Sequence, residues 1–288
     1  MYPSRFRYEA PHSLDEALAL FARFGDEAKV LAGGQSLVPL LKLRFASPEL
    51  LVDINCIPGL DYHREDADGT LRIGALCRHA TLERSALLAA KHPLMASAAP
   101  LIADPIVRNR GTLVGSLCHS DPQGDWASVL LALGGHVVAV GPSGRRTIPA
   151  AEFSVGPFQN ALLPGEMAVE AVVPAPTGAV SGIYLKLERR VGDFATAGVA
   201  IALETTGSRV TRAGIALTGV GASNIQAGAA EQALVGRPLS EDSIEEAAQL
   251  AAEAARPKSD HRGSAAYKRH VVATFVRRGL ARSEAVAA

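Results

Sequence analysis

Cysteine is scarce and scattered in this chain of 288 residues. The three cysteines, Cys56, Cys77 and Cys118, are odd in number and show no C-x-x-C spacing. We therefore expect neither a disulfide framework nor a zinc or iron–sulfur site held by this chain. The eight histidines form no H-E-x-x-H motif and no cluster with carboxylates. The sequence thus nominates no metal ligands and no catalytic nucleophile–base pair.

Excess charge and long apolar runs are lacking too. Lys+Arg and Asp+Glu both number 29, so nothing supplies the basic surface that nucleic acid or an anionic membrane would need. The nearest candidate for a membrane span, which begins at Val129, is broken by Gly134-Gly135-His136. Residues 1–7 lack the apolar core of a secretory signal. We expect a cytoplasmic protein without nucleic-acid partners, and zero net charge is compatible with a subunit of a complex.

Two turns that carry glycine are the most informative features that are present. The first, Ala32-Gly33-Gly34-Gln35-Ser36, joins an apolar strand at 28–31 to a helix that begins at Leu37. The second is Gly111-Thr112-Leu113-Val114-Gly115. Small residues let backbone N–H groups approach a phosphate closely, and a helix N-terminus adds partial positive charge. The matched pair predicts one diphosphate bound from two sides, and hence a dinucleotide cofactor.

The order of the expected elements predicts an α+β protein with two domains. Ser13 and Glu16 form a capping-box pattern before a helix that ends near Gly25. Pro174-Ala175-Pro176 is the best boundary candidate, so we predict domains at 1–176 and 177–288. The second domain is expected to hold a three-stranded antiparallel sheet followed by helices. Its expected strands are 183–189, 197–204 and 210–220, and its expected helices are 225–234, 240–256 and 264–278.

Four motifs in this order resemble the FAD-binding medium subunit of molybdenum hydroxylases, the family that includes aerobic carbon monoxide dehydrogenase and xanthine dehydrogenase. They are Ala32 to Leu37, Arg108-Asn109-Arg110-Gly111-Thr112, Asp121-Pro122 with Asp125, and Lys186 to Ala195. The resemblance implies a two-lobed FAD-binding domain of the vanillyl-alcohol oxidase type over 1–176. It also implies a C-terminal flavoprotein domain over 177–288.

The same resemblance implies a role for each of the predicted site residues. Asp125 would accept a hydrogen bond from a hydroxyl of the cofactor's sugar portion, since a carboxylate only accepts. Lys186 would lie near the isoalloxazine, where we infer that a cation raises the flavin potential. The residues that would wrap the diphosphate and ribityl region are Ala32, Gly33, Gly34, Gln35, Ser36, Gly111, Thr112, Leu113, Val114 and Gly115.

Val114 departs from the family pattern, which usually has glycine there. A β-branched residue is strained at positive φ, so this position predicts weaker or altered FAD binding. On that interpretation, Val114→Gly would keep or improve flavin retention.

The resemblance also implies partners and a function. Electrons would pass from iron–sulfur clusters of a small subunit to FAD in this chain, and then to an external acceptor. A large molybdopterin subunit would hydroxylate the substrate, and the whole would form a dimer of heterotrimers. The alternative is a free-standing FAD-dependent oxidase or dehydrogenase of a small organic substrate, for which the sequence nominates no acid–base residue. A non-redox nucleotide-binding scaffold is disfavoured because there is no G-x-x-x-x-G-K-[ST] loop.

Overall fold

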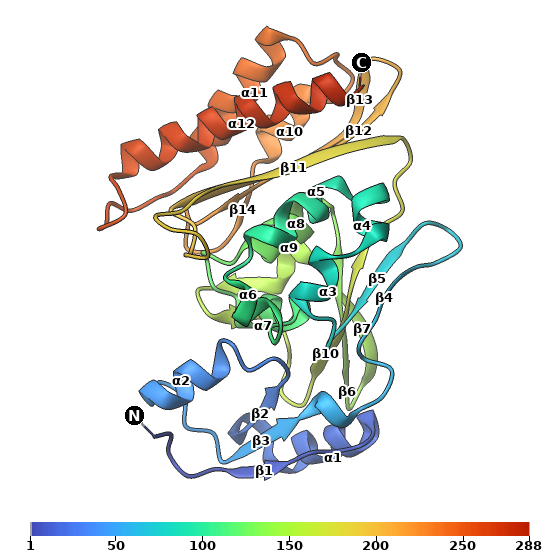
Figure 1. Cartoon of the computed structure of the whole chain (residues 1–288), viewed down its shortest axis with the longest axis vertical. Helices are drawn as coiled ribbons and strands as arrows, with labels where there is room; N and C mark the ends of the chain where they lie inside the picture. Colours follow the sequence, from blue (N-terminus) through green and yellow to red (C-terminus); the bar gives the residue numbers. More distant parts are fainter. Residues whose placement is uncertain (1, 288) are drawn as a thin grey trace.

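The computed structural model describes residues 2–287 and arranges them in three parts stacked along the long axis of the molecule (Figure 1). The N-terminal lobe lies at the bottom of this view, a second lobe in the middle, and the C-terminal domain at the top. Among the described residues, no helix has both the length and the apolar character needed to cross a membrane.

The N-terminal lobe is built on a small parallel sheet in the order β1-β3-β2. Its strands are β1 (Arg7–Glu9), β2 (Ala28–Leu31) and β3 (Leu50–Asp53), and its helices are α1 (Leu14–Phe24) and α2 (Leu37–Leu43). The Ser13 hydroxyl accepts from the Glu16 amide at 3.2 Å, as predicted, and Gly25 is the C-cap at a φ of +52°. The Glu16 carboxylate accepts from the His12 amide, one residue before the cap. The first glycine turn follows β2 directly and leads into α2.

The second lobe contains a five-stranded antiparallel sheet in the order β4-β5-β10-β6-β7. These strands are β4 (His63–Glu65), β5 (Leu71–Gly74), β6 (His136–Gly141), β7 (Gly144–Pro149) and β10 (Met167–Val173). A two-stranded sheet is formed by β8 (Ser154–Gly156) and β9 (Gln159–Asn160). The helices of this lobe are α3 (His79–Glu83), α4 (Ala86–Lys91), α5 (Pro93–Ala98), α6 (Pro105–Arg108), α7 (Leu113–His119), α8 (Asp125–Ala132) and α9 (Ala150–Phe153).

The C-terminal domain confirms the predicted antiparallel sheet and adds one short strand to it. The sheet order is β11-β12-β13-β14. Its strands are β11 (Ala179–Leu187), β12 (Ala197–Thr206), β13 (Arg209–Thr218) and β14 (Ile225–Gln226). The helices are α10 (Gly228–Leu234), α11 (Glu241–Ala254) and α12 (Ala265–Ala287). The helix expected over 225–234 therefore begins only after β14, which pairs with the end of β13.

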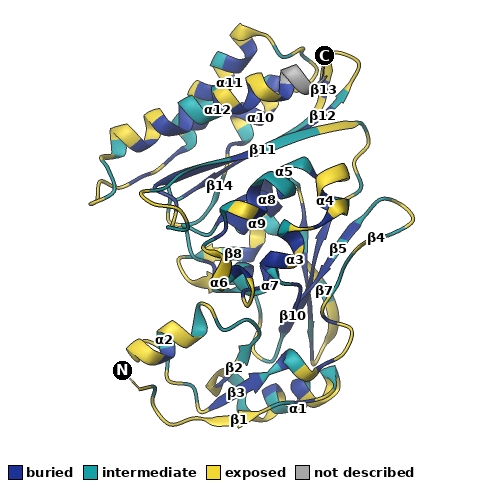
Figure 2. Ribbon diagram, viewed as in Figure 1, coloured by how far each residue is buried: buried dark blue, intermediate teal, exposed yellow. Residues whose placement is uncertain are grey.

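This sheet is buried on both faces, as the dark ribbon of its central strands shows (Figure 2). Val199, Ile201 and Leu203 belong to the core shared with α10, α11 and α12. Ala200 and Ala202, on the opposite face of β12, belong to the core of the second lobe. Because small residues line that face, α8 packs closely: a Cβ at Gly214 would lie 1.8 Å from the carbonyl oxygen of Ala132. The C-terminal domain is thereby held against α8, which packs on α7, the helix that begins at the second glycine turn.

The backbone of the second turn differs from what the family pattern suggested. Thr112 is the N-cap of α7, and its hydroxyl accepts from the Gly115 amide at 3.1 Å. Val114 lies in this helix, so its φ is helical and not positive, and its side chain is buried in the core at 2% exposure. The expectation of a strained valine is therefore wrong: valine is compatible with a helical backbone here and fills core space.

We accordingly expect Val114→Gly to destabilise the protein by about 2–3 kcal/mol, through loss of a buried side chain and introduction of a helical glycine. Urea unfolding measures the effect. Val191→Gly is the matched control, because Val191 is 91% exposed, and it should cost less than about 1 kcal/mol. A Val114→Gly protein as stable as the wild type, with better flavin retention, would restore the original interpretation.

Candidate functional site

A cavity of about 1010 Å³ opens where the two lobes and the C-terminal domain meet. Nine of the predicted site residues line it, and they come from all three parts of the molecule: Ala32, Gly33, Gly34, Gln35, Ser36, Gly111, Gly115, Asp125 and Lys186. Thr112, Leu113 and Val114 are buried instead, as the cap and first residues of α7. The Thr112 hydroxyl caps α7 and the other two side chains pack in the core, and none of the three residues is among those that line the cavity.

The two glycine turns are in direct backbone contact. A Cβ placed on Gly33 would lie 2.1 Å from the carbonyl oxygen of Arg110 and 2.8 Å from the Cα of Gly111. Gly34 has a φ of +73°, a conformation that side chains rarely adopt. Glycine is therefore required at 33 for space and is favoured at 34 for conformation. Segments far apart in the sequence form one continuous wall of the cavity.

Asn55 and Arg78 connect the same two turns through side-chain hydrogen bonds. The Asn55 side-chain amide donates to the carbonyl oxygen of Ala32 at 2.8 Å, and its own oxygen accepts from the Arg78 guanidinium. Arg78 also donates to the carbonyl oxygen of Arg110. This chain of hydrogen bonds links Ala32 in the first turn to Arg110 beside the second. Sequence reasoning missed both residues, because neither stands in a recognisable motif.

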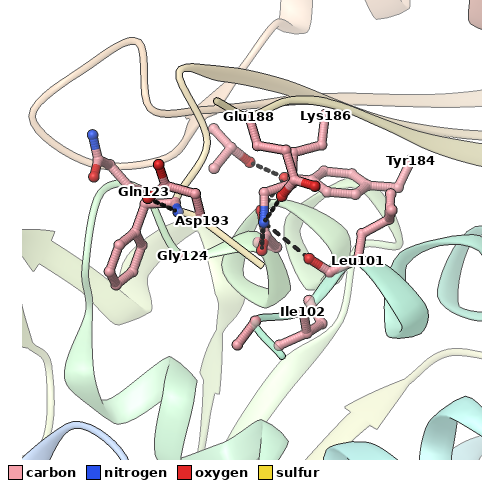
Figure 3. Close-up of polar contacts among 12 residues, drawn as sticks. Leu101, Ile102, Gln123, Gly124, Tyr184, Lys186, Glu188 and Asp193 are labelled. Atoms are coloured by element: carbon pink, nitrogen blue, oxygen red, sulfur yellow. Dashed lines mark hydrogen bonds and ion pairs between the residues drawn. The ribbon is translucent and has the colours of Figure 1, made fainter. Parts of the chain in front are cut away.

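Asp125 and Lys186 form a buried ion pair across the domain boundary. Figure 3 shows Lys186 next to Tyr184, Glu188 and Leu101. The Lys186 ammonium, on β11, lies 3.0 Å from Asp125 Oδ2 and donates to the Leu101 carbonyl oxygen at 2.9 Å. The hydroxyl of Tyr184 donates to Asp125 Oδ1 at 2.6 Å. Burial raises the pKa of Asp125, and the attraction of Lys186 offsets part of that rise. The two residues were assigned separate contacts with the cofactor, and the structure brings them together at one edge of the cavity.

Two further details describe the surroundings of this ion pair. Gly124 is the N-cap of α8, so Asp125 is the first helical residue and not the cap. A carboxylate in the first turn is still favoured by the helix dipole. Glu188 Oε2 lies 3.6 Å from the Lys186 ammonium, which therefore has carboxylates on two sides. The positive charge at Lys186 is largely balanced within the protein.

The loop after β11 completes the cavity on the side of the C-terminal domain. Gly192, Asp193 and Phe194, all in the fourth motif, line it. The Asp193 carboxylate accepts from the Arg262 guanidinium at 3.1 Å and from the Arg189 guanidinium at 3.2 Å. These ion pairs lower the pKa of Asp193, with the hydrogen bond from Arg262 as the largest cause. The loop is thus anchored to the segment that precedes α12.

His79 is a cavity residue that sequence reasoning overlooked. Its ring is buried at 4% exposure, and its Nδ1 accepts from the indole N–H of Trp126 at 3.0 Å. Burial, with smaller contributions from Arg108 and Arg78, lowers the pKa of His79 to about 4. The imidazole is therefore neutral at pH 7. No local pattern marks it, since its partner Trp126 lies on a different helix.

Cys118 and His119 also line the cavity. Burial raises the pKa of the Cys118 thiol to about 12, so it is not the thiolate that a nucleophile requires. The His119 ring packs against Phe158 with 5.1 Å between centroids. Cys118 therefore lacks the surroundings of a reactive thiolate.

Comparison with known proteins identifies the family to which the chain is related. Residues 4–176 match the family described as the FAD binding domain in molybdopterin dehydrogenase, and residues 182–283 match the CO dehydrogenase flavoprotein C-terminal domain. The chain is 42% identical to the carbon monoxide dehydrogenase medium chain of Hydrogenophaga pseudoflava, over 97% of each chain. It is also 42% identical to 6-hydroxypseudooxynicotine dehydrogenase complex subunit alpha of Paenarthrobacter nicotinovorans, over 98% of this chain and 96% of that one.

The same relationship appears in three dimensions. A solved structure of carbon monoxide dehydrogenase from Hydrogenophaga pseudoflava, which lacks the Mo-pyranopterin moiety of its molybdenum cofactor, matches with a TM-score of 0.95. The match covers 99% of both chains at 44% identity. Sequence and fold therefore agree over nearly the whole chain.

The contact between the turns generates a direct prediction. Gly33→Ala should push the two turns apart, because its Cβ would overlap the Arg110 carbonyl oxygen. We expect a loss of about 2 kcal/mol or more in the free energy of unfolding, in the range of overpacked sites. Gly228→Ala is the matched control, since a Cβ there meets nothing within 4 Å. Equal stability of the two variants in urea unfolding would contradict the contact.

Proposed function

The chain belongs to the family of FAD-binding medium subunits of molybdenum hydroxylases, and on that premise we propose that its central cavity holds one FAD between the two glycine turns. The single observation that carries this proposal is the backbone contact between Gly33 and the Arg110–Gly111 segment at the cavity wall. A cavity of about 1010 Å³ is at the upper end of the sizes typical of ligand pockets, as a dinucleotide requires.

The residues present fit FAD chemically. A wall made of glycine backbone lets the diphosphate approach amide groups without obstruction from a Cβ. We propose that residues 32–36 and 111–115 surround the diphosphate and ribityl portions. Thr112, Leu113 and Val114 contribute backbone only. Asp125 supplies an acceptor for a sugar hydroxyl, and Lys186 supplies the cation nearest to the isoalloxazine.

Flavin supplies the redox chemistry in such a subunit, and the protein's own residues bind and orient it. Lys186 is held by Asp125 and the Leu101 carbonyl oxygen, so its position in the cavity is fixed. Because Asp125 and Glu188 balance its charge, its effect on the flavin depends on the whole cluster and not on the ammonium alone.

We propose that electrons reach the FAD of this chain from the iron–sulfur clusters of a small subunit and leave to an external acceptor. The large subunit carries the molybdopterin and the substrate chemistry. In this assignment the holoenzyme is a dimer of heterotrimers in the cytoplasm. The identity to a carbon monoxide dehydrogenase medium chain and to a subunit of another dehydrogenase complex, over almost their full length, supports the division into subunits.

The domain limits 1–176 and 177–288 are part of the same proposal. Two family matches that end at 176 and begin at 182 support a boundary between them. The proline-rich segment 174–176 follows β10 and precedes β11, so the boundary would lie in the connection between two sheets.

The function is tested by titrating the flavin-free full chain with FAD and following visible absorbance. We expect a yellow complex that bleaches with dithionite and does not turn over organic substrates unless its partner subunits are added. A chain that stays colourless in excess FAD would refute the cofactor. Oxidation of a small organic substrate by the isolated yellow chain would instead support a free-standing oxidase or dehydrogenase.

The charged cluster yields a prediction about Lys186. Lys186→Met would leave Asp125 and Glu188 without their cation, and we expect a cost of about 3–5 kcal/mol in folding stability. In the FAD-loaded protein the flavin midpoint potential should fall, since loss of the ammonium makes the local charge more negative by one unit. Adding Asp125→Asn should recover part of both losses. Arg190→Met, at an exposed site beyond β11, is the control and should leave the potential unchanged. A flavin midpoint potential that is also unchanged by Lys186→Met would contradict a position of this cluster beside the flavin.

A further inference from the structure

The imidazole of His79 is held in one tautomer by Trp126. An indole N–H can only donate, so the nitrogen that receives it, Nδ1 at 3.0 Å, must carry a lone pair. In the neutral ring the proton is therefore on Nε2. The two rings also lie stacked, 6.1 Å apart between centroids, with planes inclined by 28°. His79 thus presents a fixed N–H donor rather than an interchangeable donor and acceptor.

The free side of this ring faces the second glycine turn. A Cβ on Gly111 would lie 2.8 Å from both Nε2 and Cδ2 of His79, so glycine is what allows the ring to lie there. The backbone amide of His79 donates to the Gly111 carbonyl oxygen at 3.0 Å, which ties the two segments together. Both residues line the cavity. Within residues 2–287, no hydrogen bond of the protein engages Nε2.

The Nε2–H group is open to the cavity, where an oxygen of a ligand could accept its hydrogen bond in place of solvent. His79 is uncharged, unlike the arginine side chains around it. The positive charges of Arg108 and Arg78 disfavour a second proton on the ring. A neutral donor adds a hydrogen bond to a ligand oxygen without adding positive charge.

We propose that His79 contacts the cofactor directly, with Nε2–H donating to an oxygen of the FAD diphosphate or ribityl chain beside Gly111. Trp126 is then a positioning residue, which acts by fixing the tautomer. This inference rests on the proposed binding of FAD and adds to it a residue that none of the four motifs contains.

The test is ¹⁵N NMR of the histidine rings in the full chain, recorded with and without FAD. We expect the Nε2–H tautomer for His79 before addition, and a shift of its Nε2 resonance on addition. His136, on β6 and outside the cavity lining, serves as the internal control and should not shift. An unchanged His79 resonance in protein shown by absorbance to have bound FAD would overturn the inference. Failure of the wild type to bind FAD would instead overturn the proposed function.

Affinity measurements give a second, independent readout. His79→Phe should weaken FAD binding about five- to tenfold, the range for one lost hydrogen bond. His79→Gln, which keeps a side-chain N–H, should lose less, and Trp126→Phe should lose affinity while the NMR spectrum shows mixed tautomers at His79. His136→Gln should bind as the wild type does. If His79→Phe fails to fold, the NMR experiment on the wild-type chain still tests whether His79 contacts FAD. If His79→Phe folds and binds FAD as tightly as the wild type, the proposal is wrong.

Discussion

The backbone contact between the two glycine turns is the constraint on which the site depends. Gly33 lies so close to the Arg110 carbonyl oxygen that no side chain fits between them. The turns belong to different lobes, so this contact also sets how the lobes face each other. Asn55 and Arg78 reinforce it by joining the carbonyl oxygens of Ala32 and Arg110 through side-chain hydrogen bonds. The cavity wall is therefore rigid where a diphosphate would need close and fixed amide groups.

The C-terminal domain contributes a charged side chain, Lys186, to the site. Lys186 extends from β11 to Asp125 at the start of α8, and both side chains are almost fully buried. Such a pair is expensive to break, because either partner alone would be a buried, unbalanced charge. The small residues on the inner face of β12 and β13 let α8 come close enough for the pair to form. Packing of one domain against the other thus determines the electrostatics beside the proposed flavin.

Features with a local signal in the sequence were predictable. Glycine-bearing turns after an apolar strand, the Ser13 cap and the long apolar strands of the C-terminal sheet all follow from neighbouring residues, and the α+β class follows from their order. Val114 was misread because a family pattern names residue types and not backbone angles: α7 begins at Leu113, and position 114 is already helical. Strand β14 has two residues, too few to show alternation.

Other parts of the site arise only from tertiary structure. His79 becomes a fixed donor because Trp126, on another helix, supplies an N–H to its ring. Asn55 and Arg78 connect two turns that the sequence separates widely. Asp125 and Lys186 were both identified, yet their pairing depends on how the C-terminal sheet packs against α8. Of these residues, only Asp125 and Lys186 were identified from the sequence, and none of the contacts was.

Amide hydrogen exchange of the full chain, with and without FAD, tests the central claim most directly. If one cofactor lies between the two turns, exchange should slow on FAD addition in both 32–36 and 111–116, with smaller changes on the outer strands β4 and β7. Slowed exchange in only one of the two segments, or in neither while FAD is bound, would contradict a shared site.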